Sequence, residues 1–346
     1  MDGEVVEQIL LAVDGGNSKT DVALVTTRGE VLATGRSGPF APQSEGVPAA
    51  VEVVVRAVRQ AVANLPEAVR QAAANPAGGG DLPALAHVAA YLAGADLPVE
   101  EEALAGGFTA RGFGDDIVVR NDTFALLRAG ASGPWGVAVV CGAGINAVGV
   151  SPTGQLARFP ALGRISGDWG GGLGLGEEAL WHAVRAEDGR GPVTALAGLI
   201  TTHFGASTVE DVVLGLHFGH LAEADLMDLA PGVLATAAAG DALARSLVER
   251  QAEEITVMAE VCLRRLDLLE TPTEVILGGG ILAARDPLLT SLLDTSFALR
   301  APRAKLVVAD LPPVVGAALN GLEHLGASEE AKARLRSHYE HQPHQP

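Results

Sequence analysis

An apolar run that ends in an aspartate and two glycines, with a second apolar run directly after it, constrains the fold of this chain more than any other feature. The first run covers residues 9–14 and the second covers residues 21–27. Runs of this length on either side of glycine predict two β-strands joined by a tight turn. The sequence therefore predicts a buried strand that delivers a carboxylate and a glycine turn to its carboxyl end.

The turn between these two strands has the composition of an anion site. Its glycines have no Cβ atoms, so backbone N–H groups can approach a phosphate closely. The polar residues after them add donors, and the aspartate can hold Mg²⁺ directly or through water. A Walker A loop is excluded because its spacing and its following helix are both missing, whereas a plain hairpin turn remains an alternative. The candidate nucleotide ligands in this segment are Asp14, Gly15, Gly16, Asn17, Ser18, Lys19 and Thr20.

Composition limits the size of the fold and the class of partner. The chain has 346 residues, of which 48% are hydrophobic, and this is enough for two domains. Its net charge of −18 disfavours nucleic acid and anionic membrane surfaces as partners. An anionic ligand must therefore be held by local backbone donors rather than by the overall charge.

Several features predict a cytoplasmic protein. No segment reaches the roughly 20 apolar residues that span a bilayer. The acidic start, residues 1–8, lacks the basic region of a signal peptide. The two cysteines, Cys141 and Cys262, lie far apart in sequence, which favours a reducing compartment over a disulfide scaffold.

The same predicted order of strands and helices occurs twice, first from about residue 9 and again from about residue 136. We therefore expect an α/β fold with two similar domains, residues 1–132 and 133–313, and a cleft between them. A helical insert covers about 177–270 of the second domain. A helix over 314–328 could pack back on the first domain, and 329–346 is expected to be a partly disordered tail.

Two further glycine turns occur in the expected second domain. Gly142-Ala143-Gly144, with Asn146 just beyond it, stands between two predicted strands at the position that matches the first turn. It could clamp a polyphosphate from the other side, although a tight hairpin explains it as well. Gly278-Gly279-Gly280 follows a buried strand, and such a turn can let an adenine or ribose pack flat on the backbone.

Asn121-Asp122-Thr123 follows another apolar run, so the Asp122 carboxylate also stands at the end of a predicted strand. All three residue types are favoured helix N-caps, so the segment can simply start a helix. A carboxylate at a strand end is also where a general base for a substrate hydroxyl would lie. The residues alone leave both interpretations open.

The segment 163–176 is rich in glycine around Asp168 and Trp169. Such a loop is costly to order, which favours a binding role over a flexible linker into the helical insert. Asp168 could bind a sugar hydroxyl or a metal-bound water. Trp169 could offer its apolar face to a sugar ring.

Together these residues resemble the sugar kinase, actin and heat-shock chaperone ATPase superfamily. The similarity is closest to the BadF/BadG/BcrA/BcrD-type ATPase family and its N-acetylglucosamine kinase branch. The resemblance extends over roughly residues 8–325 and includes 312–318, which is similar to the superfamily's late connecting helix. It implies two ribonuclease-H-like (actin-like ATPase) domains that use ATP and Mg²⁺.

The resemblance also implies roles for single residues. Asp122 would accept the proton of a sugar 6-hydroxyl, beside Asn121 as a sugar ligand. Asn146 and Asp168 would contact the sugar, and Mg²⁺ would be held by Asp14 and, through water, by Asp168.

Two departures from the family pattern affect the sugar contacts. The family's Gly-Asp-Glu-Gly-Ser is replaced by residues 167–171 without the glutamate, and the loop 37–44 lacks the usual asparagine. Ser37 and Gln43 are the candidates to replace that asparagine.

Three functions remain open on the sequence. The first is a kinase for the 6-hydroxyl of an amino sugar, either N-acetyl-D-glucosamine or glucosamine, with the small sugar as its partner. The second is a BadF-type ATPase that activates a reductase partner, which needs an iron–sulfur cluster shared by Cys141 and Cys262 of two subunits. The third is a non-catalytic sugar sensor. A homodimer through the alanine- and leucine-rich insert is a further expectation.

Overall fold

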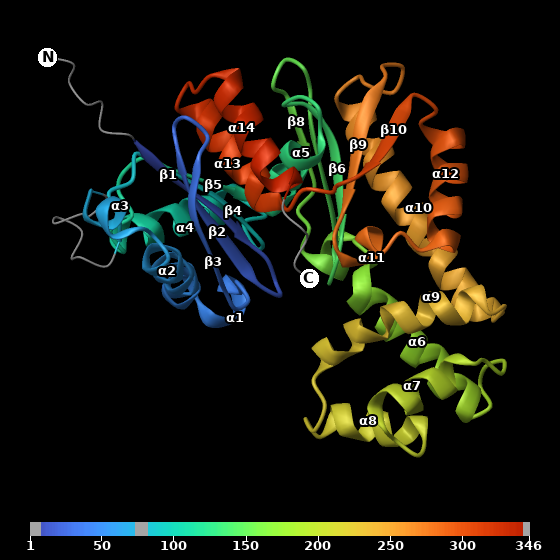
Figure 1. Ribbon diagram of the computed structural model, residues 1–346. Helices are drawn as coiled ribbons and strands as arrows, with labels where there is room; N and C mark the ends of the chain where they lie inside the picture. Colours follow the sequence, from blue (N-terminus) through green and yellow to red (C-terminus); the bar gives the residue numbers. More distant parts are fainter. Residues whose placement is uncertain (1–7, 73–81, 342–346) are drawn as a thin grey trace, which may run out of the picture. The chain divides into compact units, whose positions relative to one another are not determined.

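The computed structural model describes residues 8–72 and 82–341, and the chain divides into two compact units (Figure 1). Unit 1 comprises residues 1–134 and 309–346, and unit 2 comprises residues 135–308. The chain thus changes unit after residues 134 and 308, where the sequence prediction has domain limits at 132 and 313. The acidic start and the last part of the expected tail, 342–346, lie outside the described residues.

The sheet of unit 1 has five strands in the order β3-β2-β1-β4-β5. The first three strands are antiparallel, and β1, β4 and β5 are parallel. Carboxyl ends of parallel strands meet at one edge, so the ends of β1, β4 and β5 lie side by side. The strands are β1 (Ile9–Gly15), β2 (Thr20–Thr26), β3 (Val31–Ser37), β4 (His87–Leu92) and β5 (Ile117–Asn121).

Helices cover both faces of this sheet. Along β1, Leu11 and Val13 belong to the core shared with α2 and α4, whereas Leu10 faces α13 at Gly321. This alternation is the period-2 pattern of a strand buried on both sides. The helices of unit 1 are α1 (Pro42–Glu45), α2 (Val47–Ala63), α3 (Glu67–Ala72), α4 (Pro98–Ala110), α5 (Asp122–Gly130), α13 (Pro313–His324) and α14 (Glu329–Glu340).

Residues Glu329–Glu340 of the expected tail form the ordered helix α14. Ser328 caps α14 by accepting from the Ala331 N–H, and Ala331 and Leu335 are buried. The Arg336 guanidinium donates to backbone carbonyls at the end of α5, at 2.9–3.0 Å. These contacts with unit 1 order a segment whose polar composition gave no such indication.

The sheet of unit 2 repeats the sheet of unit 1 strand for strand. Its order is β10-β9-β6-β7-β8, with β6, β7 and β8 antiparallel and β6, β9 and β10 parallel. The predicted α/β fold with two ribonuclease-H-like units is therefore confirmed. The strands are β6 (Gly136–Cys141), β7 (Ile145–Val150), β8 (Leu156–Arg158), β9 (Thr273–Gly278) and β10 (Ala304–Val308).

Helical structure between β8 and β9 begins earlier than the sequence suggests. Helix α6 starts at Gly171 rather than near residue 177, so glycines expected in a loop lie inside a helix. The reason is close packing, because a Cβ on Gly176 would lie 2.0 Å from the Leu226 carbonyl oxygen of η2. The helical elements of unit 2 are η1 (Gly163–Ser166), α6 (Gly171–Glu187), α7 (Leu196–Phe204), α8 (Val209–His217), η2 (Glu223–Leu229), α9 (Ala230–Ala238), α10 (Ala242–Arg265), α11 (Gly280–Ala283) and α12 (Pro287–Arg300).

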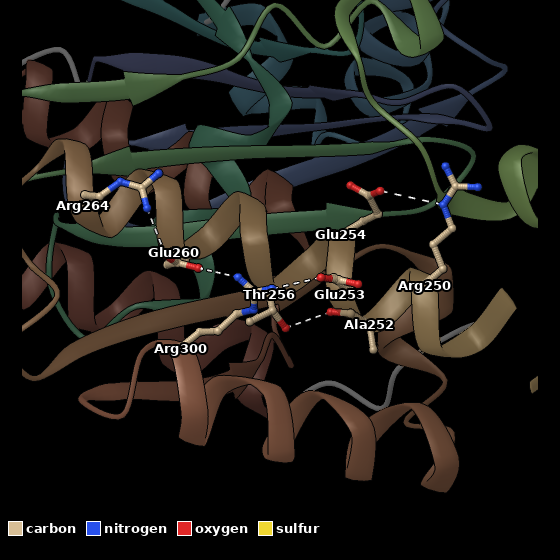
Figure 2. A network of polar contacts seen from close by, with 8 residues as sticks. All are labelled: Arg250, Ala252, Glu253, Glu254, Thr256, Glu260, Arg264 and Arg300. Carbon is tan, nitrogen blue, oxygen red and sulfur yellow. Dashed lines mark hydrogen bonds and ion pairs between the residues drawn. The ribbon is translucent and has the colours of Figure 1, made fainter. Parts of the chain in front are cut away.

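The long helix α10 is tied to α12 by charged side chains (Figure 2). Arg300 of α12 donates to Glu253 at 2.9 Å and to Glu260 at 3.2 Å, and Arg264 donates to Glu260 at 3.0 Å. Exposed ion pairs contribute little individually, so this network fixes the orientation of α12 more than it stabilises unit 2.

Within residues 8–72 and 82–341, no single helix is long and apolar enough to cross a bilayer. The segment Glu223–Ala238 and helix α10 pass the test only together, as a pair bent by 115°, on length and composition alone.

Candidate functional site

The first glycine turn closes at the carboxyl end of β1. The Gly16 N–H donates to the Lys19 carbonyl at 2.8 Å, and the Phe40 N–H donates to the Gly16 carbonyl at 2.9 Å. A Cβ on Gly15 would lie 2.7 Å from the Leu92 side chain at the end of β4. Glycine at this position therefore leaves room for the Leu92 and Phe40 side chains to pack against the turn.

The tip of this turn projects into solvent. Asn17, Ser18 and Lys19 are exposed, and the Lys19 ammonium lies 3.3 Å from Asp21. Thr20 is fully buried and its hydroxyl donates to the Gly38 carbonyl at 3.0 Å. The hydroxyl hydrogen of Thr20 is thus used to hold the loop after β3, while the exposed tip presents its polar groups outward.

At the end of β5, the cap and the candidate base are different residues. Asn121 is the N-cap of α5, and its Oδ1 accepts from the Thr123 N–H at 3.0 Å. The Asn121 amide also donates to Asp96 at 2.7 Å. Asp122 is the first residue of the helix, so the capping role that the sequence left open belongs to its neighbour.

Two carboxyl groups of unit 1 have raised pKa values. Burial, followed by the negative charges of Asp122 and Asp21, raises the pKa of Asp14 to about 8, against the opposing charge of Lys19. Burial raises the pKa of Asp122 to about 6, although the backbone N–H groups of Thr123 and of Asp122 itself lower it. Burial is the first cause at both carboxyls, and a bound cation would offset its cost, so this sheet edge is a candidate cation site.

The two residues expected to replace the family's asparagine make contacts inside unit 1. The Ser37 hydroxyl donates to the Val53 carbonyl at 2.7 Å, and the Gln43 amide donates to the Gly94 carbonyl at 2.9 Å. These bonds fasten the loop after β3 to α2 and to the end of β4. Both side chains shape this end of the unit 1 sheet.

Asp96 is a residue of this edge that sequence reasoning missed. It follows β4 and accepts from Asn121, and the Glu100 carboxylate accepts from its backbone N–H at 3.0 Å. A carboxylate a few residues after a parallel strand is the signal that could have identified it.

In unit 2 the structure brings the second and third glycine turns together. Val140 of β6 pairs with Gly278 of β9, so the two turns leave adjacent parallel strands. Gly279 has a φ of +86°, and a Cβ there would lie 2.4 Å from the Cys141 carbonyl oxygen. Gly280 then begins α11. Only glycine permits this close contact between the two backbone segments.

The second turn also receives the start of α6. The Gly172 and Leu173 N–H groups donate to the Gly142 and Ala143 carbonyls at 2.7 and 3.0 Å. A Cβ on Gly171 would lie 2.5 Å from Gly144. The helix N-terminus thus supports the turn instead of presenting these N–H groups to a ligand.

Gln251 is a second residue that the sequence did not reveal. It is fully buried in the middle of α10, and its Oε1 accepts from the Gly171 N–H at 2.9 Å. A buried amide inside a long helix gives no signal in a single sequence, yet here it anchors the start of α6, which supports the second turn.

The expected sugar ligands of unit 2, Asn146 and Asp168, both lie between the second turn and the start of α6 in sequence. Asn146 is buried on β7, and its Oδ1 accepts from the Ala147 N–H at 2.7 Å. Asp168 is half-buried and accepts from the Ser166 hydroxyl at 2.5 Å. Its negative charge is among the causes that raise the pKa of Glu254, after burial of that carboxyl.

Trp169 is not an exposed platform for a sugar, so that expectation is wrong. The side chain is 6% exposed and belongs to the core of unit 2. The Arg250 guanidinium lies 4.0 Å from the ring centroid and covers one face. Arg250 also pairs with Glu254, as Figure 2 shows. The residue that replaces the family's glutamate is thus a core residue.

Both cysteines are buried in the core of unit 2. Burial raises the pKa of each thiol, Cys141 and Cys262, to about 12. A cluster shared between subunits needs exposed thiolates, so this environment disfavours the reductase-activator hypothesis.

A pocket of about 190 Å³ lies beside the third glycine turn. Leucine side chains of β9, α12 and β10 form much of its wall, and charged residues stand among them. An apolar wall with a few polar groups is typical of a site for a flat, partly polar ring. Its lining residues are Leu277, Ile281, Leu282, Arg285, Asp286, Leu289, Thr290, Leu293, Asp294, Leu306 and Val308.

Two copies of one sheet, each with a glycine turn between its first two strands, define a protein of the actin-like ATPase fold. The chain belongs to the BadF/BadG/BcrA/BcrD ATPase family, whose sequence model matches residues 11–321. This confirms the family that the sequence predicted.

Named relatives of similar length exist. The N-acetylmuramic acid/N-acetylglucosamine kinase of Clostridium acetobutylicum is 23% identical over 273 residues, which cover 79% of this chain and 85% of that protein. The N-acetyl-D-glucosamine kinase of Dictyostelium discoideum is 23% identical over 322 residues, or 91% and 98% of the two chains. A crystal structure from Chromobacterium violaceum, of a protein proposed to be an N-acetylglucosamine kinase, has a TM-score of 0.70 at 25% identity and covers 91% of this chain and 99% of that one.

Proposed function

We propose that this protein uses ATP to phosphorylate the 6-hydroxyl of an amino sugar, with N-acetyl-D-glucosamine as the substrate. The observation that carries the proposal is the pair of carboxyl groups, Asp14 and Asp122, with raised pKa values at one edge of the unit 1 sheet. The named relatives act on N-acetylated sugars, which favours an N-acetylated substrate over free glucosamine.

The residues present fit a nucleotide. The exposed tip of the first turn, residues 17–19, offers polar groups for the phosphates, together with Asp14, Gly15, Gly16 and Thr20. Gly142, Ala143 and Gly144 form the matching turn of unit 2. The adenine would lie in the pocket beside Gly278, Gly279 and Gly280, where a Cβ on Gly279 would collide with the neighbouring backbone.

The donor set also fits Mg²⁺. A carboxyl that burial and two neighbouring negative charges hold at a pKa of about 8 gains most from a bound cation. Asp14 would hold the ion and Asp168 would reach it through water. When bound, Mg²⁺ neutralises the phosphate charge that develops during phosphoryl transfer.

Asp122 would act as the general base. As the sugar 6-oxygen forms its bond to the γ-phosphorus and the bond to ADP breaks, the hydroxyl proton passes to the Asp122 carboxylate. A pKa of about 6 makes this carboxylate a stronger proton acceptor than an ordinary aspartate while leaving it ionised near pH 7. Asn121, Asn146 and Asp168 would bind the sugar hydroxyls. Ser37 and Gln43 would shape the sugar site through their contacts at the end of the unit 1 sheet.

ADP release with ATP and Mg²⁺ tests the proposal directly. The panel is N-acetylglucosamine, N-acetylmuramic acid, glucosamine, N-acetylmannosamine and glucose. We expect release that depends on N-acetylglucosamine and is lost in Asp122→Asn. The matched control is Asp115→Asn, an exposed aspartate just before the same strand, which should keep full activity. Hydrolysis that is indifferent to every sugar would overturn the proposal.

Cytoplasmic location and homodimerisation belong to the same proposal. Trp181 of α6 and Phe218 at the end of α8 are 52% and 65% exposed, and both lie in the helical segment expected to form the dimer contact. The molar mass in solution, measured by light scattering, tests the dimer.

A further inference from the structure

Three side chains outside the candidate active site gather at the amino ends of β4 and β5, in unit 1. His87 is the first residue of β4, Asp116 directly precedes β5, and His324 is the last residue of α13. Because β4 has six residues, this cluster lies about 16 Å along the strand from the edge that carries the carboxyl pair. It is therefore separate from the site proposed for catalysis.

The three residues already have the spacing of metal ligands. His87 Nδ1 lies 3.2 Å from Asp116 Oδ1, and His324 Nε2 lies 3.0 Å from the same oxygen. One donor atom from each residue lies within 4.8 Å of the other two. Metal–ligand bonds of about 2.0–2.1 Å place neighbouring donors roughly 3.0 Å apart around an octahedral ion and roughly 3.4 Å apart around a tetrahedral one.

A second observation points to a ligand at the same place. The His87 side chain is 1% exposed, and its Nδ1 lies 3.2 Å from Asp116 Oδ1 without the alignment of a full hydrogen bond. A buried ring nitrogen without a well-aligned hydrogen bond costs free energy, so a metal ion bound to this nitrogen would remove that cost.

The surrounding structure holds the three groups in place. The Val88 N–H donates to the Asp116 carbonyl at 2.9 Å, which fixes Asp116 against the start of β4. The rings of His87 and His324 stack with centroids 4.1 Å apart. A Cβ on Gly321 would lie 3.4 Å from the His87 ring, so α13 passes close to it. The donors are thus arranged by the fold and need little rearrangement to bind.

We propose that His87, Asp116 and His324 bind one divalent transition-metal ion that fastens the end of α13 to β4 and β5. Imidazole nitrogen with one carboxylate oxygen is a donor set for Zn²⁺ and its neighbours, whereas Mg²⁺ and Ca²⁺ prefer oxygen alone. Asp116 and His324 are 47% and 43% exposed, which leaves a path for the ion and room for water to complete its coordination.

Metal titration of the full chain tests this proposal. Every protein used carries Ala at the tail histidines His338, His341 and His344, and the buffer contains Mg²⁺ to occupy any all-oxygen site. After removal of metal with a chelator, we expect one Zn²⁺ or Co²⁺ per chain. At 100 times the Kd, the thermal transition of unit 1 should rise by about 5–10 °C.

Substitutions identify the ligands. Asp116→Asn and His324→Ala should abolish uptake of the ion, and His217→Ala, at the exposed end of α8, should retain it. Asp116→Asn keeps an oxygen that can accept a hydrogen bond from His324, so loss of the ion from a folded variant separates metal binding from hydrogen bonding. Absence of uptake by the parent, or equal uptake by both cluster variants, would overturn the proposal.

Discussion

At the scale of single residues, two neighbours at the end of β5 divide their tasks. Asn121 caps α5 and donates to Asp96, whereas Asp122 is half-buried at the first helical position and has a pKa of about 6. From sequence, both residues were possible caps, the strand-end position also allowed a general base, and family resemblance favoured the catalytic role of Asp122. Which of them caps the helix depends on backbone geometry, and this is why the sequence could not decide.

Replacing Asp122 with Asn should lower turnover by about 10²–10⁴-fold because the amide cannot accept the proton. The same change should stabilise unit 1 at pH 8. Burial raises the pKa from 3.8 to about 6, and each pKa unit represents about 1.4 kcal/mol, so we expect a gain of about 1–3 kcal/mol. Steady-state kinetics and thermal unfolding followed by circular dichroism measure the two effects.

The pH dependence of this stability gain provides the control for the Asp122→Asn experiment. The folded-state pKa of Asp122 exceeds the unfolded value, so its contribution to stability falls as pH rises from about 4 to about 6. The gain from Asp122→Asn should therefore shrink towards zero at pH 4. Loss of both stability and activity at pH 8 would instead show that Asp122 has a structural role.

The pH dependence of activity follows from the same group. The base must be unprotonated, so kcat/KM should fall about tenfold per pH unit below a midpoint near pH 6 instead of near pH 4. Rates from pH 5 to pH 8 at saturating Mg²⁺ measure this, with circular dichroism at each pH to show that the protein remains folded. A flat profile down to pH 5 would contradict the assignment.

At the scale of elements, strands were more predictable than the starts of helices. Strands β1 and β5 were predicted to within a few residues because apolar runs ending in glycine or asparagine mark strand ends. Helix α6 was predicted to start too late because glycine has low helix propensity, and two of its glycines, Gly172 and Gly176, are explained by contact with η2, an element about 50 residues further along the chain. Tertiary contact of this kind leaves no local signal.

Two glycines of α6 should respond in opposite directions to alanine. Gly176→Ala places a Cβ 2.0 Å from the Leu226 carbonyl and should cost about 1–3 kcal/mol. Gly174→Ala meets no atom closer than 4.0 Å and should gain about 0.5–1 kcal/mol through helix propensity. All three tryptophans, Trp135, Trp169 and Trp181, lie in unit 2, so urea unfolding followed by tryptophan fluorescence reports this unit. Equal effects of the two substitutions would contradict the packing argument.

At the scale of the whole molecule, the chain leaves unit 1 after residue 134 and returns to it at residue 309. The repeated strand order made two similar units predictable, and the glycine turns marked one end of each sheet. Asp96, Gln251 and the histidine cluster were not predictable, because each depends on residues that are distant in sequence and only meet in the fold. The returning helix α13 is the clearest case, since it supplies His324 to a cluster whose other members lie more than 200 residues earlier.

Because α13 packs back on unit 1, the folding of unit 1 should require residues 309–346. Four large side chains of this helix, Val314, Val315, Leu319 and Leu322, are buried in unit 1. At about 1.5–3 kcal/mol each, their burial contributes about 6–12 kcal/mol, which is comparable to the whole stability of a domain. A fragment of residues 1–134 should therefore show no cooperative thermal transition by circular dichroism.

The matched fragment is residues 135–308, which is continuous in sequence and has its own core. It should unfold cooperatively, with all three tryptophans reporting the transition. Adding a peptide of residues 309–346 to the first fragment should restore its transition, because α13 packs closely on α5: a Cβ on Gly316 would lie only 1.9 Å from the Ala125 carbonyl oxygen. A cooperative transition of the first fragment without the peptide would show that β1–β5 with α1–α5 already form a sufficient core.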